Sequence, residues 1–257
     1  MSESSETKLD PYTRSKAEAM YSETNLTLDV LGCKYGTDKV SVQVVGNTVK
    51  RCHDYLRHYD FLFHQFRNDE LAIVEFGCLG GSSLRMWQEY FPKAEIYGVD
   101  LDEKCRRFNG ERIHIVIGDA THKETYDELE KQLGERKPMI ILDDASHAWG
   151  DQRRSLELFW SLLAPGGFYV VEDLECPSIG VYPQHPPEVL DAQPFINYLF
   201  YLCETLRWAP DRGYHYPNEY TFKQTPKIIQ DIRLSLDGLY LMPGTAALRK
   251  RVPPLPH

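Results

Sequence analysis

The chain has 257 residues, of which 42% are hydrophobic and 26% are charged. This length is enough for one large domain with a substantial core, and the composition is that of an ordinary globular protein. The formal net charge of −9 leaves no basic face for DNA or RNA, so nucleic acid is not an expected partner.

The cysteine pattern indicates a reducing compartment. Six cysteines are present, without CxxC spacing and mostly inside apolar runs, as is typical of reduced buried thiols. The sequence contains no run of about 18 apolar residues. Its first residues are polar and charged, unlike a signal peptide. We therefore expect a cytoplasmic protein without a membrane partner.

The hydrophobic pattern predicts an N-terminal segment followed by an α/β domain. Residues 1–66 are expected to form a polar arm and an amphipathic helix over 52–66. In the region 67–257, helical segments such as 83–90 and 152–163 separate apolar strand candidates that begin near Leu71, Ala94, Ile113, Met139 and Gly167. This spacing is typical of repeated βαβ crossovers, and it predicts a mostly parallel sheet covered on both faces.

The last part of the chain breaks this rhythm. A proline-rich stretch, a helix candidate over 192–208 and a tyrosine-rich segment form an insertion at about 176–228, either a cap over the sheet edge or a plain surface insertion. The segment from Ile232 to Met242 then has two apolar runs around Asp237 and Gly238, which is a strong hairpin signal. A doubly wound sheet that ends in an antiparallel hairpin indicates the methyltransferase variant of the Rossmann-like architecture.

A glycine-rich turn follows the first strand candidate. Its glycines let the backbone turn tightly and approach a ligand where a Cβ atom would clash. The spacing is not GxGxxG, the pattern that seats a dinucleotide pyrophosphate, so a ligand with an amino-acid end fits better. The serines and backbone amides would bind its carboxylate, with the glutamate near its ammonium group; the alternative is a turn that holds no ligand. The residues concerned are Glu75, Gly77, Gly80, Gly81, Ser82 and Ser83.

Acidic residues also end the second and third strand candidates. Asp100 is placed to accept hydrogen bonds from both hydroxyls of a ribose, and Asp102 could take its place. Asp119 and Ala120 follow the third strand, where a side chain or an amide could reach an adenine edge. Because each aspartate alone is also explained as a helix cap or turn residue, the predicted nucleoside pocket depends on their joint occurrence.

The fourth and fifth strand candidates end in four carboxylates. These are Asp143 and Asp144 on one strand and Glu172 and Asp173 on the other. If the strands are parallel neighbours, the acids meet at the edge where open α/β sheets bind ligands. They would repel each other there without a cation, and hard carboxylate oxygens suit Mg²⁺. One helical turn after Asp144, His147 would lie beside such a metal, although a surface or capping histidine is the simpler alternative.

In chain order, these motifs resemble those of the metal-dependent sugar O-methyltransferases of antibiotic biosynthesis, a group that includes the macrocin and mycinamicin enzymes. The resemblance covers roughly residues 34–175 and departs at three places: the insertion between Lys39 and His53, Ala145 in place of glycine, and the segment after Glu175. The motifs that carry it are Lys-Tyr-Gly-Thr-Asp-Lys, His-x-Tyr-x-x-x-Tyr, Glu-x-Gly-x-x-x-Gly-x-Ser, Gly-Val-Asp, Gly-Asp, Leu-Asp-Asp-Ala-Ser-His and Gly-Gly-Phe-Tyr-Val-Val-Glu-Asp.

The resemblance implies a class I methyltransferase fold with a seven-stranded sheet, S-adenosyl-L-methionine as cofactor, and Mg²⁺ or another divalent cation. Carried over by position, it implies Asp144, Glu172 and Asp173 as metal ligands and His147 as general base. Asp143 could support these ligands or lie near the cofactor's reactive methyl group, and a helix-capping role is the simpler alternative. The expected substrate is a deoxysugar hydroxyl, above all of rhamnose, on a nucleotide sugar such as TDP-rhamnose or on a finished glycoside. A homo-oligomer is expected from the family alone.

Three alternatives fit part of the pattern. A catechol-type O-methyltransferase would bind a vicinal diol to the same metal. An NAD-dependent sugar-nucleotide oxidoreductase fits less well, because GxGxxG is missing and hydride transfer does not require the acidic pair on the fifth strand. A binding module that has kept only the nucleoside pocket would bind the cofactor without turnover.

Overall fold

The computed structural model describes residues 28–45, 48–176, 194–203 and 226–253. The chain divides into two compact units, residues 1–70 with 80–94 and residues 71–79 with 95–257, and each unit is described by itself. The predicted N-terminal arm and most of the predicted insertion at 176–228 lie outside the described residues. The proposed boundary at residue 66 and the cap over the sheet edge therefore stay predictions.

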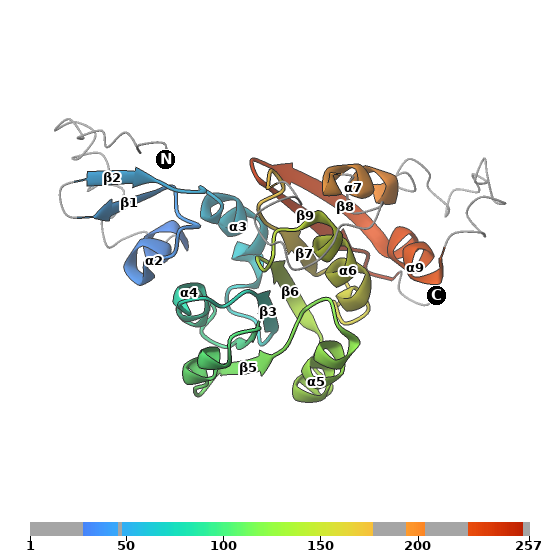
Figure 1. Cartoon of the computed structure of the whole chain (residues 1–257), viewed down its shortest axis with the longest axis horizontal. Coiled ribbons are helices and arrows are strands. Elements are labelled where there is room, and N and C mark those ends of the chain that lie inside the picture. Colours follow the sequence, from blue (N-terminus) through green and yellow to red (C-terminus); the bar gives the residue numbers. More distant parts are fainter. Residues whose placement is uncertain (1–27, 46–47, 177–193, 204–225, 254–257) are drawn as a thin grey trace. The chain divides into compact units, whose positions relative to one another are not determined.

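The first unit combines helices with a two-stranded hairpin. Its elements are α2 (Leu28–Tyr35), the antiparallel strands β1 (Val42–Val45) and β2 (Thr48–Arg51), α3 (Leu56–Phe63), the 3-10 helix η1 (His64–Phe66) and α4 (Ser82–Tyr90) (Figure 1). α2 packs against α3 and α4. Tyr59, Phe63 and Trp87 form a buried aromatic cluster between α3 and α4. The helices expected over 52–66 and 83–90 are thus confirmed in part or in full, whereas the hairpin was not predicted.

The second unit is built on a seven-stranded sheet. The strands lie in the order β5-β4-β3-β6-β7-β9-β8. The first five strands are parallel to one another, and β9 pairs antiparallel with both β7 and β8. This arrangement confirms the α/β class and the mostly parallel sheet. The bounds are β3 (Ala72–Phe76), β4 (Glu95–Asp100), β5 (Ile113–Ile117), β6 (Pro138–Asp143), β7 (Phe168–Val171), β8 (Leu236–Met242) and β9 (Thr245–Lys250).

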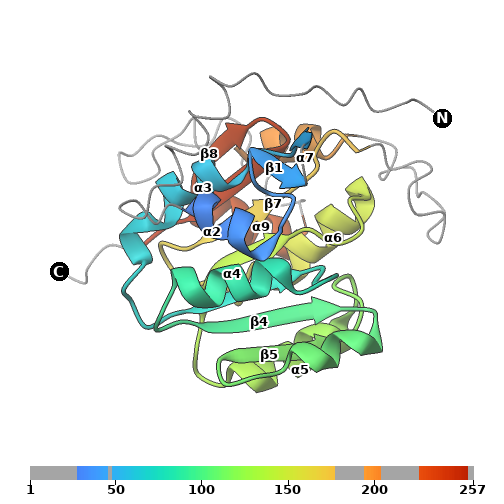
Figure 2. The ribbon, with the colours of Figure 1, turned by 90° about the vertical axis from the view of Figure 1, so that its left-hand side faces the viewer.

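The central strands are buried and the helices of this unit pack against one another. β3 and β7 are buried at every position, as expected for inner strands of a parallel sheet, and Glu75 is the one charged residue among them. α6 (Trp149–Phe159) contacts α5 (Lys123–Leu133), α7 (Phe195–Cys203) and α9 (Lys227–Ser235). Figure 2 shows β4 and β5 side by side at the edge opposite β8. The short 3-10 helix η2 (Glu103–Phe108) connects these two strands.

The predicted hairpin turn at Asp237 and Gly238 is wrong. α9 extends to Ser235, β8 runs through both residues to Met242, and the chain reverses around Gly244, whose φ is +72°. Gly238 lies where the register between β8 and β9 shifts. A glycine inside a strand often marks such a bulge, so the Asp-Gly pair here produces an irregularity within the strand.

The helices can also be compared with the requirements of a membrane span. In the part of the chain that the structure describes, no helix has both the length and the apolar character needed to cross a bilayer.

Candidate active site at the carboxyl edge of the sheet

The candidate site begins where the strand order reverses. The chain proceeds from β3 to β4 and β5 on one side and then to β6 and β7 on the other, so the ends of β3 and β6 form the switch point at which open α/β sheets bind ligands. Gly77, directly after β3, has φ +87°, and a Cβ atom there would lie 2.1 Å from the carbonyl oxygen of Asp144. The close approach that Gly77 permits is therefore to the backbone after β6.

Asp100 organises the turn after β3. Its Oδ2 accepts hydrogen bonds from the backbone N–H groups of Cys78 (2.7 Å) and Leu79 (3.1 Å), and its Oδ1 accepts one from the N–H of Asp102 (2.8 Å). A carboxylate has about four lone-pair positions, so this side chain retains capacity for a ligand hydroxyl. The Asp102 carboxylate instead accepts a hydrogen bond from the N–H of Lys104 (2.9 Å) and caps η2. This is the capping role that was the alternative to a ribose contact.

The remaining residues of the predicted turn divide between the two units. Glu75 lies at the end of β3 and is completely buried, and burial, with the Glu75 charge as a further cause, raises the pKa of the nearby Cys78 thiol well above its usual value. Gly80, Gly81, Ser82 and Ser83 belong to the first unit, where Gly81 (φ +69°) is the residue before α4. Their contact with a ligand therefore stays a prediction.

The end of β5 lies next to the end of β4. The Gly118 N–H donates to the Asp100 carbonyl oxygen (2.9 Å). The Asp119 carboxylate accepts from the N–H (2.8 Å) and the hydroxyl (2.7 Å) of Thr121, a local turn contact, and Ala120 is buried. The structure thus places this strand end beside Asp100, while the predicted adenine contact is not tested by these interactions.

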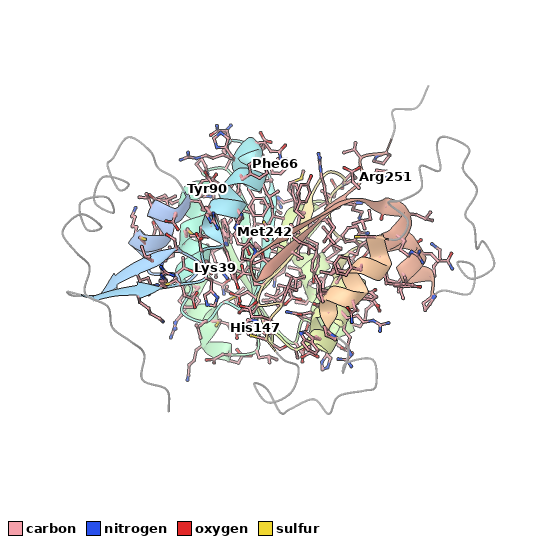
Figure 3. All side chains as sticks on the ribbon, turned by 90° about the horizontal axis from the view of Figure 1, so that it is seen from above. Lys39, Phe66, Tyr90, His147, Met242 and Arg251 are labelled. Carbon is pink, nitrogen blue, oxygen red and sulfur yellow. The ribbon has the colours of Figure 1, made fainter. Side chains whose placement is uncertain are left out.

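Three potential metal ligands converge beyond β6 and β7. One ligand atom each of Asp144, His147 and Asp173 lies within 4.8 Å of the other two. His147 Nδ1 is 3.9 Å from Asp144 Oδ1, and its Nε2 is 3.4 Å from Asp173 Oδ2. Figure 3 labels His147 at this end of the sheet. All three side chains are largely buried, so their charges are only weakly screened by solvent.

Two of these three residues have an unusual backbone conformation. His147 has φ +57° and Asp173 has φ +55°. Residues other than glycine rarely adopt this region, and they do so mainly where the surrounding structure enforces it. The strain therefore occurs at the residues that bring the imidazole and the second carboxylate together.

The donor set fits a divalent cation. The Asp144 and Asp173 carboxylates suit Mg²⁺, whereas the His147 imidazole would suit a first-row metal. Ligands about 2.1 Å from one Mg²⁺ ion lie at most about 4.2 Å apart. The observed separations, within 4.8 Å, therefore need only a small closure.

Glu172 and Asp143 have different surroundings from this group of three. Glu172, a predicted metal ligand, is buried and is not one of the three converging side chains; its backbone N–H donates to the Asp143 carbonyl oxygen (3.0 Å). The buried Asp143 carboxylate accepts hydrogen bonds from the Ser155 hydroxyl and, at 3.4 Å, from the Tyr169 hydroxyl. Burial raises the pKa of Asp143 to about 6. These contacts agree with a supporting role for Asp143, and its predicted contact with the cofactor stays untested.

Comparison with curated proteins finds similar proteins of one kind. No family model matches the chain. The chain is 34% identical over 129 residues to mycinamicin VI 2''-O-methyltransferase of Micromonospora griseorubida, covering 48% of this chain and 32% of that protein. It is 36% identical over 129 residues to demethylmacrocin O-methyltransferase of Streptomyces fradiae, with the same 48% and 32% covered. For 8-demethyl-8-alpha-L-rhamnosyl tetracenomycin-C 2'-O-methyltransferase of Streptomyces olivaceus, the identity is 33% over 153 residues, covering 56% and 37%.

The chain is a homologue of these O-methyltransferases. This finding confirms the resemblance seen in the sequence motifs. The chain spans only about a third of the length of the curated relatives that it matches.

Solved structures agree with this relationship. MycE methyltransferase from the mycinamycin pathway, in complex with Mg and SAH, matches with a TM-score of 0.66 and 25% identity over 88% of this chain and 55% of that chain. A second crystal form of the same complex gives a TM-score of 0.69 at 22% identity over 96% and 62%. The fold is therefore the class I methyltransferase fold.

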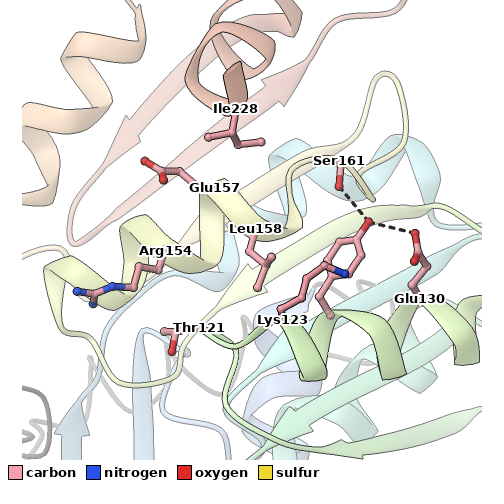
Figure 4. Close-up of a pocket in the computed structure, with 9 residues that line it drawn as sticks. Thr121, Lys123, Glu130, Arg154, Glu157, Leu158, Ser161 and Ile228 are labelled. Atoms are coloured by element: carbon pink, nitrogen blue, oxygen red, sulfur yellow. Dashed lines mark hydrogen bonds between the residues drawn. The ribbon is translucent and has the colours of Figure 1, made fainter. Parts of the chain in front are cut away.

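A separate pocket lies between the helices of the second unit. It has a volume of about 690 Å³ and none of the predicted site residues lines it. On its wall, the Tyr126 hydroxyl donates to Glu130 Oε1 (3.0 Å) and lies 3.2 Å from the Ser161 hydroxyl oxygen. Figure 4 labels Glu130 and Ser161. The pocket is lined by Thr121, Lys123, Tyr126, Glu130, Arg154, Glu157, Leu158, Ser161 and Ile228.

Two side chains that contact residues of the candidate site were missed in the sequence. Gln152 and Ser155 are buried on α6, three residues apart and therefore on the same helix face. Gln152 Nε2 donates to the Glu172 carbonyl oxygen (2.9 Å), and Ser155 donates to Asp143. The signal that could have found them was a pair of polar residues on the inward face of an otherwise amphipathic helix.

Proposed function

We propose that the protein is an S-adenosylmethionine-dependent O-methyltransferase that methylates a deoxysugar hydroxyl in antibiotic biosynthesis. The observation that carries this proposal is the convergence of Asp144, His147 and Asp173 beside the glycine turn at the switch point of the sheet. The activities of the curated relatives support the reaction type and the class of acceptor.

In this proposal, the ends of β3, β4 and β5 bind the cofactor. Glu75 and the turn that follows β3 hold the amino-acid end, Asp100 accepts from the ribose hydroxyls, and Asp119 with Ala120 borders the adenine. The MycE structure contains bound SAH, which supports this choice of cofactor. The hydrogen bonds from three backbone N–H groups preorganise the Asp100 carboxylate before any ligand binds.

Asp144 and Asp173 would hold the divalent cation, with Glu172 as the further ligand that the family resemblance implies. When bound, the cation stabilises the alkoxide character that develops on a coordinated hydroxyl. MycE binds Mg in the same complex, which supports this ion. His147 lies 3.9 Å from the Asp144 carboxylate and 3.4 Å from the Asp173 carboxylate, beside the proposed metal ligands, so its position suits the role of the general base that takes the hydroxyl proton.

The reaction then needs no covalent enzyme intermediate. The sugar oxygen forms a bond to the methyl carbon while the carbon–sulfur bond breaks, its electron pair remains on sulfur, and the proton goes to His147. Because the sugar oxygen must lie about 3 Å from the methyl carbon and in line with the leaving sulfur, positioning by the surrounding residues supplies much of the rate.

The acceptor is the finer part of the proposal. We infer rhamnose as the methylated sugar, carried as TDP-rhamnose or in a glycoside, as in a calicheamicin-type pathway. One relative acts on a rhamnosyl tetracenomycin, which supports this choice. Three other outcomes would replace this proposal: methyl transfer to a catechol, hydride transfer with NAD, or cofactor binding without turnover. Assembly as a homo-oligomer stays a prediction.

The reaction and the metal are tested with the variant Asp144→Asn. We expect calorimetry to show S-adenosylhomocysteine binding to wild type and variant within about threefold, and no NAD binding. Because one metal-binding carboxylate is lost, turnover should fall by at least about 100-fold. Asp127→Asn on the exposed face of α5 is the matched control and should behave as wild type. Full wild-type turnover in EDTA would contradict the metal mechanism.

The acceptor is tested by mass spectrometry of a substrate panel. The panel contains sugar nucleotides, rhamnosyl glycosides and catechols, each incubated with S-adenosylmethionine and Mg²⁺ and analysed for the gain of one methyl group. Methylation of rhamnosyl compounds alone supports the proposed acceptor. Methylation of catechols alone would assign the protein to the catechol-type alternative.

A further inference from the structure

The turn after β7 is held by hydrogen bonds on both sides of Asp173. Before it, the Glu172 N–H donates to the Asp143 carbonyl oxygen (3.0 Å). After it, the Leu174 N–H donates to the Gly244 carbonyl oxygen (2.9 Å). These contacts attach the turn to β6 and to the loop between β8 and β9, but neither one sets the orientation of the peptide group between Glu172 and Asp173.

That peptide group is held by Gln152. The side chain of Gln152 is 1% exposed and its Nε2 donates to the carbonyl oxygen of Glu172 (2.9 Å). This carbonyl belongs to the peptide plane directly before Asp173, and the φ angle of Asp173 describes the rotation relative to that plane. A hydrogen bond to the carbonyl therefore restrains φ of Asp173 at +55°, a region that is uncommon for residues other than glycine.

The conformation of Asp173 decides where its carboxylate lies. In the observed conformation, Asp173 Oδ2 is 3.4 Å from His147 Nε2 and lies in the group with Asp144. Rotation of the preceding peptide plane toward negative φ would turn the side chain away from this group. The hydrogen bond from Gln152 thus acts on the Asp173 carboxylate through the backbone carbonyl of Glu172.

We propose that Gln152 is a positioning residue, which holds the Glu172–Asp173 peptide so that the Asp173 carboxylate faces Asp144 and His147. The inference rests on the proposed function, because it assigns to this carboxylate the binding of a divalent cation. Gln152 lies in the first turn of α6, whose N–H group at Gln152 bonds to the Ala148 carbonyl oxygen (2.9 Å), so the start of the helix after His147 also aligns the end of β7.

The second polar atom of Gln152 separates this role from ordinary packing. Among the residues that the structure describes, none makes a hydrogen bond to the buried Gln152 Oε1. A side chain selected only for stability would gain from replacing this amide with an apolar group of similar shape, because a buried acceptor without a partner is costly. The near-isosteric variant Gln152→Met removes that acceptor together with the bond to Glu172.

The test compares metal binding with cofactor binding in the full chain. Mn²⁺ is used as the probe, measured by calorimetry and by the electron paramagnetic resonance signal of the free ion, and S-adenosylhomocysteine affinity and melting temperature are measured in parallel. For Gln152→Met we expect Mn²⁺ affinity to fall about 10- to 100-fold, the usual effect of losing a group that orients a metal ligand. S-adenosylhomocysteine affinity should stay within about twofold, since its predicted contacts lie on β3, β4 and β5.

Two further variants complete the test. Gln132→Met, at an exposed glutamine of α5, is the matched control and should keep wild-type Mn²⁺ affinity. If Gln152→Met does not fold, Gln152→Asn is used to test the proposal. Its side chain retains an amide but is too short to reach the Glu172 carbonyl oxygen in the same way, so Mn²⁺ affinity should fall.

The outcomes are distinguishable from those of the proposed function. Absence of Mn²⁺ binding in the wild type would overturn the proposed metal site itself. Wild-type Mn²⁺ binding that is unchanged in the folded Gln152 variants would overturn the positioning role alone. A parallel fall of Mn²⁺ affinity, S-adenosylhomocysteine affinity and melting temperature would also overturn it, because that pattern indicates a general packing role.

Discussion

Gly77 lies directly against the backbone that follows β6. Its φ of +87° and the 2.1 Å that would separate a Cβ atom from the Asp144 carbonyl oxygen each exclude a side chain. We predict that Gly77→Ala lowers the free energy of unfolding by about 3 kcal/mol, because the clash is with backbone and cannot be relieved by a side-chain rotation. Urea unfolding measures this loss. S-adenosylhomocysteine affinity should fall as well, since the β3 turn must move.

A second glycine allows the cost of an unfavourable backbone conformation to be measured without a steric clash. Gly134, after α5, has φ +61° but no atom within 4 Å of the position where a Cβ would lie. Its ψ is −122°, so this backbone conformation is nearly restricted to glycine, and Gly134→Ala should cost about 2 kcal/mol from the conformation alone. Equal losses in the two variants would show that the contact between Gly77 and Asp144 has no special cost.

The turn after β3 is the element that connects the sheet to the proposed cofactor site, and Asp100 maintains its shape. We predict that Asp100→Ala, which leaves the N–H groups of Cys78, Leu79 and Asp102 without this acceptor, lowers the free energy of unfolding by about 2 kcal/mol. S-adenosylhomocysteine should bind at least about tenfold more weakly, because the turn loses its shape and the ribose loses its acceptor. Chemical unfolding and calorimetry measure the two effects.

Asp102→Ala is the control for this element. Its carboxylate caps η2 through the Lys104 N–H alone, so about 1 kcal/mol of stability should be lost with no change in S-adenosylhomocysteine affinity. If Asp102→Ala weakened the cofactor analogue as much as Asp100→Ala, the ribose acceptor would have to be reassigned.

At the level of elements, periodicity and strand-end chemistry predicted most of what positions the site. The apolar runs from Leu71 to Gly167 and the glycines after β3 led to the correct parallel strands, because buried strands leave a strong compositional signal. The Asp237–Gly238 pair led to a wrong prediction of the turn, because the same dipeptide suits both a turn and a bulge. Only the strand pairing with β9 distinguishes these two structures.

The candidate site was predictable in part for a similar reason. Acids at strand ends indicated Asp144 and Asp173, which the structure does bring together with His147. The left-handed conformations of His147 and Asp173 depend on surrounding contacts, so the neighbouring sequence does not predict them. The hydrogen bond from Gln152 joins residues 20 positions apart and depends on the packing of α6, which the sequence pattern alone does not specify.

Across the whole molecule, the second unit contains the whole sheet and the converging donor group, while the second half of the glycine turn and α4 belong to the first unit. The antiparallel strands β9 and β8 extend the parallel sheet beyond β7 and bring the loop at Gly244 to the Leu174 N–H, next to Asp173. The C-terminal hairpin therefore supports the site although it contributes none of its predicted ligands. This arrangement links the stability of the sheet's end to the geometry of the proposed metal site.

The end of that hairpin contains a lysine whose titration affects global stability. Lys250, the last residue of β9, donates through Nζ to the carbonyl oxygens of Trp160 (2.9 Å) and Leu163 (2.7 Å). Burial, with a smaller effect of the Lys137 charge, lowers its pKa from 10.5 to about 8. Between these two pH values the unfolded chain binds more protons than the folded chain, so this residue makes the free energy of unfolding rise as the pH increases from about 8 to 10.5.

We predict that Lys250→Met removes this pH dependence. Below pH 8 both folded and unfolded wild type carry the charge, and the cost of burying it is fully present; above that value the folded protein releases the proton and the cost is relieved. The difference in unfolding free energy, wild type minus Lys250→Met, should therefore increase steadily between pH 8 and 10, as measured by urea unfolding at fixed ionic strength. Lys137→Met, at an exposed position, should reproduce only a small part of this change. A difference that stays constant over this range would show that the folded protein keeps Lys250 protonated, with its two carbonyl contacts offsetting the burial.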